Sequence, residues 1–369
     1  MSRPKLLLVG RRRYQLPLDA SLAHKFDAMR EVLDLRVVGS APAGAPTSDD
    51  TFRLVPPFPL RALDGALFYL ALPFRVASEL RAFAADAMLA QAPYEAAAAI
   101  VGRRLARRPT PVILDVHGDW RTATRLYGSR ARRALNPLAD AVAAWAVRRA
   151  DSVRTVSDFT STIVRQLGVE PTATFPAFMD LEPFLRDPAP LPREPRALFV
   201  GVLELYKGVD LIPETWRRVT ARVPEARLRI VGDGRRRDVV TRLVDEDTRV
   251  TWEPRLTTEE IANELDASTC LFLPSRREGM GRVVVEAFCR GRPVVGTRGG
   301  GIEDLVRDGE NGLLATQDDV EALADALARL LGDRALAERL GSRSRESSEE
   351  WYATPQEFAS RIRALIRQE

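Results

Sequence analysis

Two successive series of short apolar segments, alternating with amphipathic helical segments, run along the chain. In the first series we predict strands at 5–10, 35–39, 87–91, 111–117, 152–157 and 172–175, with helices such as 18–32, 94–107, 130–149 and 158–167 between them. The second series has strands at 197–201, 227–231, 249–252, 269–274, 293–297 and 312–315. Near-continuous apolar strands separated by helices are typical of parallel sheets covered on both faces. Each half is therefore predicted to be a doubly wound, Rossmann-like α/β domain.

A proline-rich segment lies between the two series. Residues 186–195 hold four prolines, which disfavour both helix and central strand and suit a semi-rigid linker. We predict a first domain at 1–187, a linker at 188–195, a second domain at 196–350 and a final helix at 351–369. Ligands of open parallel sheets bind beyond the carboxyl ends of the strands, so two such domains facing a cleft would place the functional loops there.

Composition excludes several classes of protein. With 369 residues, 45% hydrophobic and 29% charged, the chain is neither disordered nor a disulfide scaffold. The apolar run 65–74 has half the roughly 20 residues that a spanning helix needs, and the first residues lack a signal-peptide pattern. Both cysteines, Cys270 and Cys289, lie in apolar segments and suit a reducing compartment. A cytoplasmic protein is expected.

Charge is unevenly distributed. The chain carries +7 up to Pro190 and −3 beyond it. A positive first half indicates either a solvated arginine-rich surface or an anionic partner, such as a membrane surface, a phosphorylated lipid or nucleic acid. Basic helical segments there could rest peripherally on anionic lipid at the inner face of a membrane; their arginines are Arg103, Arg104, Arg107, Arg108, Arg130, Arg132 and Arg133. Nucleic-acid binding is disfavoured, because no zinc spacing, recognition helix or aromatic-interleaved basic patch occurs.

The segment 274–287 offers the most informative chemistry. It follows a predicted strand, passes Gly279, Met280 and Gly281, and opens a helix. Glycines let the backbone approach a ligand, and the first amides of a helix bind anions, which favours a diphosphate here. Glu278 and Glu286 could accept hydrogen bonds from sugar or ribose hydroxyls, or could be two exposed acids beside a tight turn.

Other strand ends carry similar signals. Lys207, one of three lysines, stands in a Lys-Gly loop after the strand at 197–201. Gly232 belongs to a Gly-Asp-Gly turn after the strand at 227–231, and glycines cluster again at 299–301. A single Gly-x-Gly is weak evidence, but several such loops at one predicted sheet edge strengthen the prediction of a phosphate site.

Taken in order, these motifs resemble those of the GT-B glycosyltransferases of family 4. The segments that carry the resemblance are ADSVRTVSDF (150–159), FPAFMDLEPF (175–184), GVLELYKG (201–208), VGDG (231–234), EGMGRVVVEA (278–287), GRPVVG (291–296), GGGIEDLV (299–306) and DGENGLL (308–314). Glu278 and Glu286 have the family's E-x7-E spacing. Before residue 110 the likeness is one of layout only.

The resemblance implies retaining transfer of a hexose-type sugar from a nucleoside-diphosphate donor, without a metal or other cofactor. Lys207 would neutralise the diphosphate, Glu286 would bind the ribose and Glu278 would orient the donor sugar. The remaining donor contacts would come from Gly232, Arg255, Leu256, Gly279, Met280 and Gly281. Same-face attack guided by the leaving phosphate would need no protein nucleophile, unlike the carboxylate pair of retaining hydrolases.

The first half would hold the acceptor, which could be a glycan, a lipid or a small molecule. His117, in Asp-Val-His-Gly-Asp, matches a cleft histidine of the family and would act near the sugar or acceptor hydroxyl, with Asp119 beside it. Arg11, Arg12 and Arg13 suggest an anionic or polyhydroxylated acceptor, or else a solvated turn.

Two departures from the family matter. Val202 stands where an arginine often follows the glycine of the second domain's first strand, which leaves Arg277 or Arg282 to supply a phosphate cation. Ala177-Phe178 replaces the usual Asn-Gly before Asp180. A nucleotide-sugar epimerase of similar two-domain layout is the alternative enzyme, although the E-x7-E and Lys-Gly elements argue against it.

Overall fold

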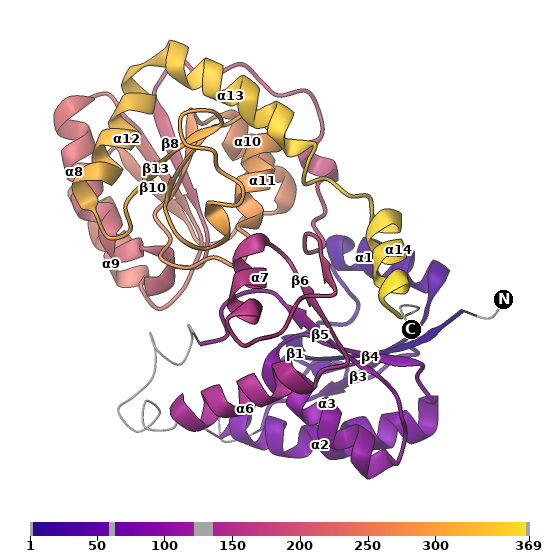
Figure 1. The fold of residues 1–369 in the computed structure, drawn as a ribbon. Helices are drawn as coiled ribbons and strands as arrows, with labels where there is room; N and C mark the ends of the chain where they lie inside the picture. Colours follow the sequence, from indigo (N-terminus) through magenta and orange to yellow (C-terminus); the bar gives the residue numbers. More distant parts are fainter. Residues whose placement is uncertain (1–2, 59–62, 122–135, 367–369) are drawn as a thin grey trace. The chain divides into compact units, whose positions relative to one another are not determined.

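The computed structural model describes residues 3–58, 63–121 and 136–366, and its internal contacts divide the chain into two units (Figure 1). Unit 1 consists of Met1–Asp180 and Ala353–Glu369, and unit 2 of Leu181–Tyr352. The proline-rich segment therefore groups with unit 2, and the C-terminal segment groups with unit 1.

Unit 1 is built on a seven-stranded sheet whose named strands all pair in parallel, in the order β3-β2-β1-β4-β5-β6-β7. The strands are β1 (Lys5–Arg13), β2 (Asp34–Ser40), β3 (Phe52–Val55), β4 (Ala87–Ala90), β5 (Val112–Val116), β6 (Ser152–Thr155) and β7 (Ala173–Thr174). The helices are α1 (Ala20–Val32), α2 (Asp64–Phe83), α3 (Pro93–Ala106), α6 (Asn136–Arg149), α7 (Asp158–Arg165) and α14 (Pro355–Ile366).

The central strand β1 shows why the sheet needs helices on both faces. Successive side chains of a strand point to opposite faces. Leu7 and Val9 join the core beneath α2, α3 and α6, whereas Leu6 and Leu8 join the core beneath α1 and α14. All four are buried, so the uninterrupted apolar run in the sequence reflects two cores rather than one.

The C-terminal helix α14 packs against α1 within unit 1. Phe358 makes edge contacts with Phe175 and Phe178, with ring centroids 6.2 and 5.5 Å apart, and Lys25 lies over its ring. These aromatic contacts fasten a segment that follows unit 2 in sequence onto the core of unit 1.

Unit 2 has a six-stranded parallel sheet in the order β10-β9-β8-β11-β12-β13. Its strands are β8 (Arg196–Val200), β9 (Arg227–Val231), β10 (Val250–Glu253), β11 (Cys270–Leu273), β12 (Val294–Thr297) and β13 (Gly312–Ala315). Its α-helices are α8 (Ile212–Arg222), α9 (Arg237–Glu246), α10 (Thr258–Asp266), α11 (Arg282–Cys289), α12 (Val320–Gly332) and α13 (Arg334–Ser348). Short 3-10 turns are η1 (Glu182–Phe184), η2 (Leu205–Lys207), η3 (Val209–Leu211) and η4 (Gly300–Ile302). The predicted α/β fold with two doubly wound parallel sheets is confirmed.

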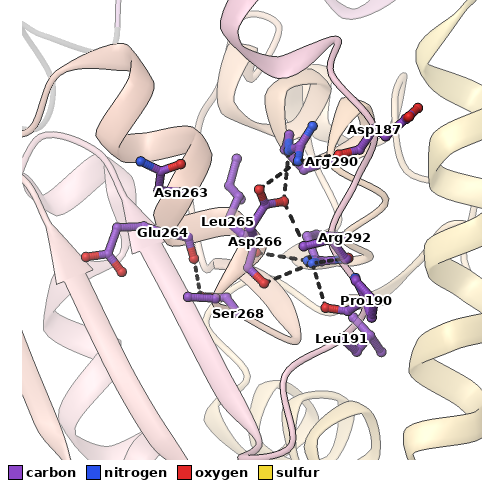
Figure 2. Close-up of polar contacts among 12 residues, drawn as sticks. Asp187, Pro190, Leu191, Asn263, Glu264, Leu265, Asp266, Ser268, Arg290 and Arg292 are labelled. Atoms are coloured by element: carbon purple, nitrogen blue, oxygen red, sulfur yellow. Dashed lines mark hydrogen bonds and ion pairs between the residues drawn. The ribbon is translucent and has the colours of Figure 1, made fainter.

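A buried ionic cluster holds the proline-rich segment on unit 2 (Figure 2). Arg290 and Arg292 are 1% and 2% exposed, and Arg290 forms a two-pronged ion pair with Asp266 at 2.6 and 2.9 Å. Arg292 donates to the carbonyl groups of Ala189 and Asp266 at 2.7 and 2.9 Å. A segment this rich in proline cannot join a helix or a sheet ladder, so its carbonyl groups lack regular donors. The two guanidinium groups supply these donors, for example to the carbonyls of Asp187 and Ala189.

The helix α2 and the strand β3 are absent from the prediction. Helix α2 buries one stripe of side chains, including Phe68 and Leu72, but Leu70 and Phe74 on another face are also apolar. Polar-apolar periodicity, the main sequence signal of a surface helix, is therefore weak there. The strand predicted at 5–10 is too short, because β1 continues through Arg13. No helix within residues 3–58, 63–121 and 136–366 is long and apolar enough to span a membrane.

Candidate functional site

The candidate site of unit 2 lies at the carboxyl edge of its sheet, where the strand order reverses. Chain order runs outward from β8 to β10 on one side, and from β11 to β13 on the other. The loops after β8 and β11 therefore diverge at the switch point, which is where open parallel sheets bind ligands. Lys207 follows β8 and Glu278 follows β11, so the topology brings together residues 71 positions apart.

Lys207 and Glu278 form an ion pair through Nζ and Oε1. Each side chain is 12% exposed, so the pair is largely withdrawn from bulk water without being sealed. Ser275 Oγ donates to the same carboxylate oxygen at 3.3 Å. The carboxylate thus holds the ammonium group in one place at the sheet edge.

Arg276 fastens the loop after β8 to the loop after β11. Its guanidinium group bonds both carboxylate oxygens of Asp210 at 2.7 and 2.8 Å, and it also donates to the carbonyl of Leu205 at 2.6 Å. Burial alone would raise the pKa of Asp210, but the hydrogen bonds and charge of Arg276 lower it. This pairing fixes η2, and with it Lys207, against the strand that precedes Glu278.

Two glycines let the backbone come close at this sheet edge, one where the loops after β8 and β11 meet and one at the start of α11. Gly208 has φ +69°, and a Cβ there would lie 1.9 Å from the carbonyl oxygen of Pro274. Gly281 has φ +76° and is the N-cap of α11. A left-handed glycine turns the chain into a helix whose first N–H groups have no acceptor within the helix. Together with the positive end of the helix dipole, these amides form an anion-binding element.

Glu286 lies in the second turn of α11, with its side chain 12% exposed. Burial raises the pKa of Glu286, while the charges of Arg282 and Lys207 lower it. Arg282 approaches Glu286 at 3.8 Å but is 52% exposed, so their direct attraction is weak. Because α11 begins four residues after Glu278, Glu286 in its second turn follows closely on the Lys207–Glu278 ion pair.

The other predicted donor residues lie at the same sheet edge. Gly232 directly follows β9, its N–H donates to the carbonyl of Glu253 at 2.9 Å, and its own carbonyl accepts from Trp252 Nε1 at 2.8 Å. Arg255 is exposed and Leu256 half-buried in the loop after β10. Gly279 and Met280 lie in the loop before α11, and Met280 is buried. These loops surround the switch point from the β9 and β10 side and from the β11 side.

Arg277 and Arg282 are the two arginines predicted to supply the phosphate cation that Val202 does not. Val202 is 45% exposed at the position where the family often has arginine. The Arg277 backbone N–H donates to the carbonyl of Tyr206 at 3.3 Å, which ties its main chain to the lysine loop. Arg282 stands at the first position of α11 with its side chain half in solvent.

In unit 1, His117 follows β5 and belongs to a charged chain of contacts. Its Nε2 lies 2.8 Å from Asp115 Oδ2, and Arg154, which is fully buried, donates to Asp115 Oδ1 at 2.5 Å. Burial would raise the pKa of Asp115, but the charges of Arg154 and His117 hold it well below its usual range. A carboxylate on one ring nitrogen fixes the tautomer and leaves Nδ1 as the second functional nitrogen. The imidazole is 43% exposed and accessible to a ligand.

The remaining predicted acceptor residues lie at two strand ends of unit 1. Asp119 follows β5, and Arg121 bonds its carboxylate oxygens at 2.8 and 3.2 Å. Arg11, Arg12 and Arg13 form the exposed end of β1, and Arg11 pairs with Asp64 at 2.9 Å. The switch point of this sheet lies between β1 and β4, so Arg11 stands beside it. The predicted basic residues Arg130, Arg132 and Arg133 lie outside the described residues.

Comparison with known proteins agrees with this arrangement. The model for Glycosyltransferase Family 4 matches residues 23–182, and the model for Glycosyl transferases group 1 matches residues 194–333. The two models fall on the two units in turn and together match more than half of the chain. The chain belongs to the GT-B glycosyltransferases of family 4.

Individual relatives show how wide this family is. The chain is 30% identical over 187 residues to sulfoquinovosyl transferase SQD2 of Arabidopsis thaliana, covering 50% of this chain and 36% of that protein. It is 34% identical over 163 residues to D-inositol 3-phosphate glycosyltransferase of Nocardia farcinica, covering 42% of this chain and 36% of that protein. Each match thus spans little more than a third of the relative.

Solved structures share the GT-B fold at lower identity. A sucrose-phosphate synthase of Thermosynechococcus elongatus gives a TM-score of 0.77 at 22% identity, over 100% of this chain and 99% of that one. HepE of Anabaena, solved in complex with UDP and glucose, gives 0.71 at 18% identity over both whole chains. At these identities the likeness establishes the fold.

Sequence reasoning missed several residues near the switch points of the two sheets. Arg276, Asp115 and Arg154 act through partners far away in sequence, so no local motif announces them. Glu95 near the start of α3 was also missed: it is 4% exposed and accepts from Tyr69 Oη at 3.0 Å and from the Arg11 backbone N–H at 3.3 Å. The only signal was an isolated acid at the head of an alanine-rich helix, which is equally typical of a first-turn glutamate facing solvent.

Proposed function

We propose that this chain transfers a hexose-type sugar from a nucleoside-diphosphate donor to an acceptor hydroxyl, with retention at the anomeric carbon. The observation that carries the proposal is the grouping of Lys207, Glu278 and Glu286 with the start of α11 at the switch point of unit 2. A cation, two hydroxyl-binding carboxylates and free helix amides together match the chemistry of a sugar joined to a nucleoside diphosphate.

In this proposal, catalysis depends on stabilising the leaving group. Negative charge increases on the diphosphate as its bond to the sugar breaks, so a fixed ammonium group and oriented amides bind the transition state more tightly than the ground state. Glu278 keeps Lys207 in position and orients the sugar, while Glu286 accepts from the ribose hydroxyls. No protein nucleophile is assigned, and Lys207 with the α11 amides takes the charge-neutralising role without a metal.

His117 and Asp119 are the acceptor-side residues of the proposal. The Asp115 carboxylate orients the imidazole of His117. His117 is thereby suited to exchange a proton with, or donate a hydrogen bond to, a hydroxyl group.

The test measures nucleoside-diphosphate release from UDP-, GDP- and ADP-sugars, with product analysis of the transferred anomer. Lys207→Met should lower turnover by roughly a hundredfold or more, as removal of one charge-stabilising donor does elsewhere. Glu286→Gln should weaken donor binding by roughly tenfold to a hundredfold, since it removes the charge from a hydrogen-bond acceptor. Lys25→Met and Glu259→Gln are matched controls, because Lys25 packs on α14 and Glu259 is exposed on α10.

Normal turnover in both site variants would reject the donor-site assignment. Loss of turnover on addition of EDTA would reject metal independence alone. An epimerised nucleotide sugar formed without acceptor would identify the epimerase alternative, which neither matching family model favours.

A further inference from the structure

Helices α2, α3 and α6 lie on one face of the unit 1 sheet (Figure 1). An apolar groove runs between these three helices. Its volume is about 660 Å³, within the range of about 300–1,000 Å³ typical of small-molecule sites. The groove is lined by Tyr69, Pro73, Tyr94, Ala97, Ala98, Val101, Leu138, Ala139, Val142 and Trp145. The only polar side-chain atoms of this lining are the two phenol groups and the indole N–H.

Large apolar side chains continue from the groove onto the surface. Leu70, Phe74 and Leu138 are 70%, 68% and 64% exposed, and Val101 and Val142 belong both to the groove and to the exposed set. Contiguous exposed apolar surface of this kind marks an interaction site rather than ordinary scatter. In α2 the exposed positions Ala66, Leu70 and Phe74 are all apolar, and polar exposed residues begin only at Arg75.

The same three helices end in exposed arginines. These are Arg81 on α2, Arg104, Arg107 and Arg108 at the end of α3, and Arg148 and Arg149 on α6. Arginine close to an apolar surface favours the phosphate groups of anionic lipids over an uncharged apolar partner. Charge and hydrophobicity on this surface are therefore complementary to a phospholipid leaflet.

One end of the groove is polar and lies at the ligand-binding edge of the sheet. α3 follows β4, so Tyr94 and Glu95 near its start stand at the carboxyl edge, beside the switch point. Tyr94 Oη and Glu95 Oε2 are buried and have no hydrogen-bond partner among the described residues. Tyr69 links the two regions, because its ring lines the groove and its hydroxyl binds Glu95.

We propose that the acceptor is a membrane lipid whose hydrocarbon chain lies in this groove, with its hydroxyl-bearing headgroup at the Tyr94–Glu95 end. The inference rests on the proposed transferase function and names its acceptor class. An open apolar groove with buried, unpaired polar atoms at one end fits an amphiphile, and the flanking arginines draw the protein to the leaflet that contains it.

The test uses the whole protein and vesicles of phosphatidylcholine and phosphatidylglycerol with brominated acyl chains, without any nucleotide sugar. The wild-type protein should co-sediment, and its tryptophan fluorescence should be quenched. Trp145→Phe should still co-sediment but lose much of the quenching, because Trp145 lines the groove. Ala97→Trp fills the groove and should weaken binding by roughly tenfold or more, whereas Ala335→Trp, exposed on α13 of unit 2, should bind like the wild type.

Leu138→Asp provides a second variant, since a charge at this exposed position should leave folding intact while opposing contact with hydrocarbon. Absence of vesicle binding, unchanged quenching in Trp145→Phe, or wild-type binding by both Ala97→Trp and Leu138→Asp would overturn the proposal. A vesicle-independent dimer abolished by Ala97→Trp would also overturn it, by making a second copy the occupant. Because no donor is present, these failures leave the transferase proposal standing with a non-lipid acceptor.

Discussion

Replacing Gly208 with alanine should damage the proposed donor site, and the geometry gives the size of the effect. The added Cβ would lie 1.9 Å from the carbonyl oxygen of Pro274, whereas real Cβ contacts are essentially never below 3.0 Å. The loops after β8 and β11 must therefore separate by about 1 Å. Because these loops carry Lys207 and Glu278, the displacement falls on the ion pair itself.

Two effects lower the free energy of unfolding of Gly208→Ala. A left-handed backbone costs alanine about 1–2 kcal/mol, and forcing extra volume into a packed contact costs about 1–3 kcal/mol. Gly309 is the matched control, because it has φ +79° in the same unit and open space around its Cα. Gly309→Ala should therefore carry only the cost of the left-handed backbone. The free energies of unfolding of the two variants should differ by the packing cost of about 1–3 kcal/mol.

Urea unfolding of both variants, together with nucleoside-diphosphate release, checks this prediction. A misplacement of about 1 Å costs roughly a hundredfold in rate, so Gly208→Ala should lose activity far beyond its loss of stability, and Gly309→Ala should keep it. Equal unfolding free energies and equal turnover in the two variants would show that the loops do not meet as described.

Two further predictions concern buried charge. Asp266→Ala leaves the Arg290 guanidinium group buried without its carboxylate, and should lower the free energy of unfolding by about 2–4 kcal/mol, measured by urea titration; exposed Asp245→Ala should change it by less than about 0.5 kcal/mol, and equal effects would refute the clamp on the proline-rich segment. The folded-state pKa of Asp115 is lowered, so its stabilising contribution is present above its unfolded pKa of about 4 and is lost as pH falls below that value. Asp115→Asn should therefore lower the melting temperature at pH 7 and flatten its dependence on pH below about 4, while a melting curve parallel to the wild type across this range would contradict the assignment.

The strand pattern alone predicted every described strand except β3, because a parallel strand buried on both faces must be apolar at nearly every position. The predicted strands at 227–231 and 312–315 coincide with β9 and β13. The start of the helix predicted at 158–167 was also correct, and Ser157 caps α7 there by accepting from the Thr160 N–H. Local chemistry of this kind needs only neighbours in sequence.

Sequence order also indicated which loops lie at the same edge of the unit 2 sheet, where we propose the donor site, because parallel strands end at one edge. Only the strand order β8-β11 brings Lys207 to Glu278. The same order lets Arg276 bind Asp210 and hold the two loops together. Strand order is not written in the hydrophobic pattern, since each strand is equally apolar whichever neighbour it pairs with.

The sequence by itself thus determined two α/β sheets, the strand-end loops and the residue types able to bind a sugar diphosphate. The tertiary structure alone decided the pairs that span long separations: Asp115 with Arg154, Asp266 with Arg290, and the groove shared by α2, α3 and α6. The physical reason is that burial and pairing are properties of the packed chain. An arginine or a phenylalanine looks the same in sequence whether it faces solvent, a carboxylate or an open apolar channel.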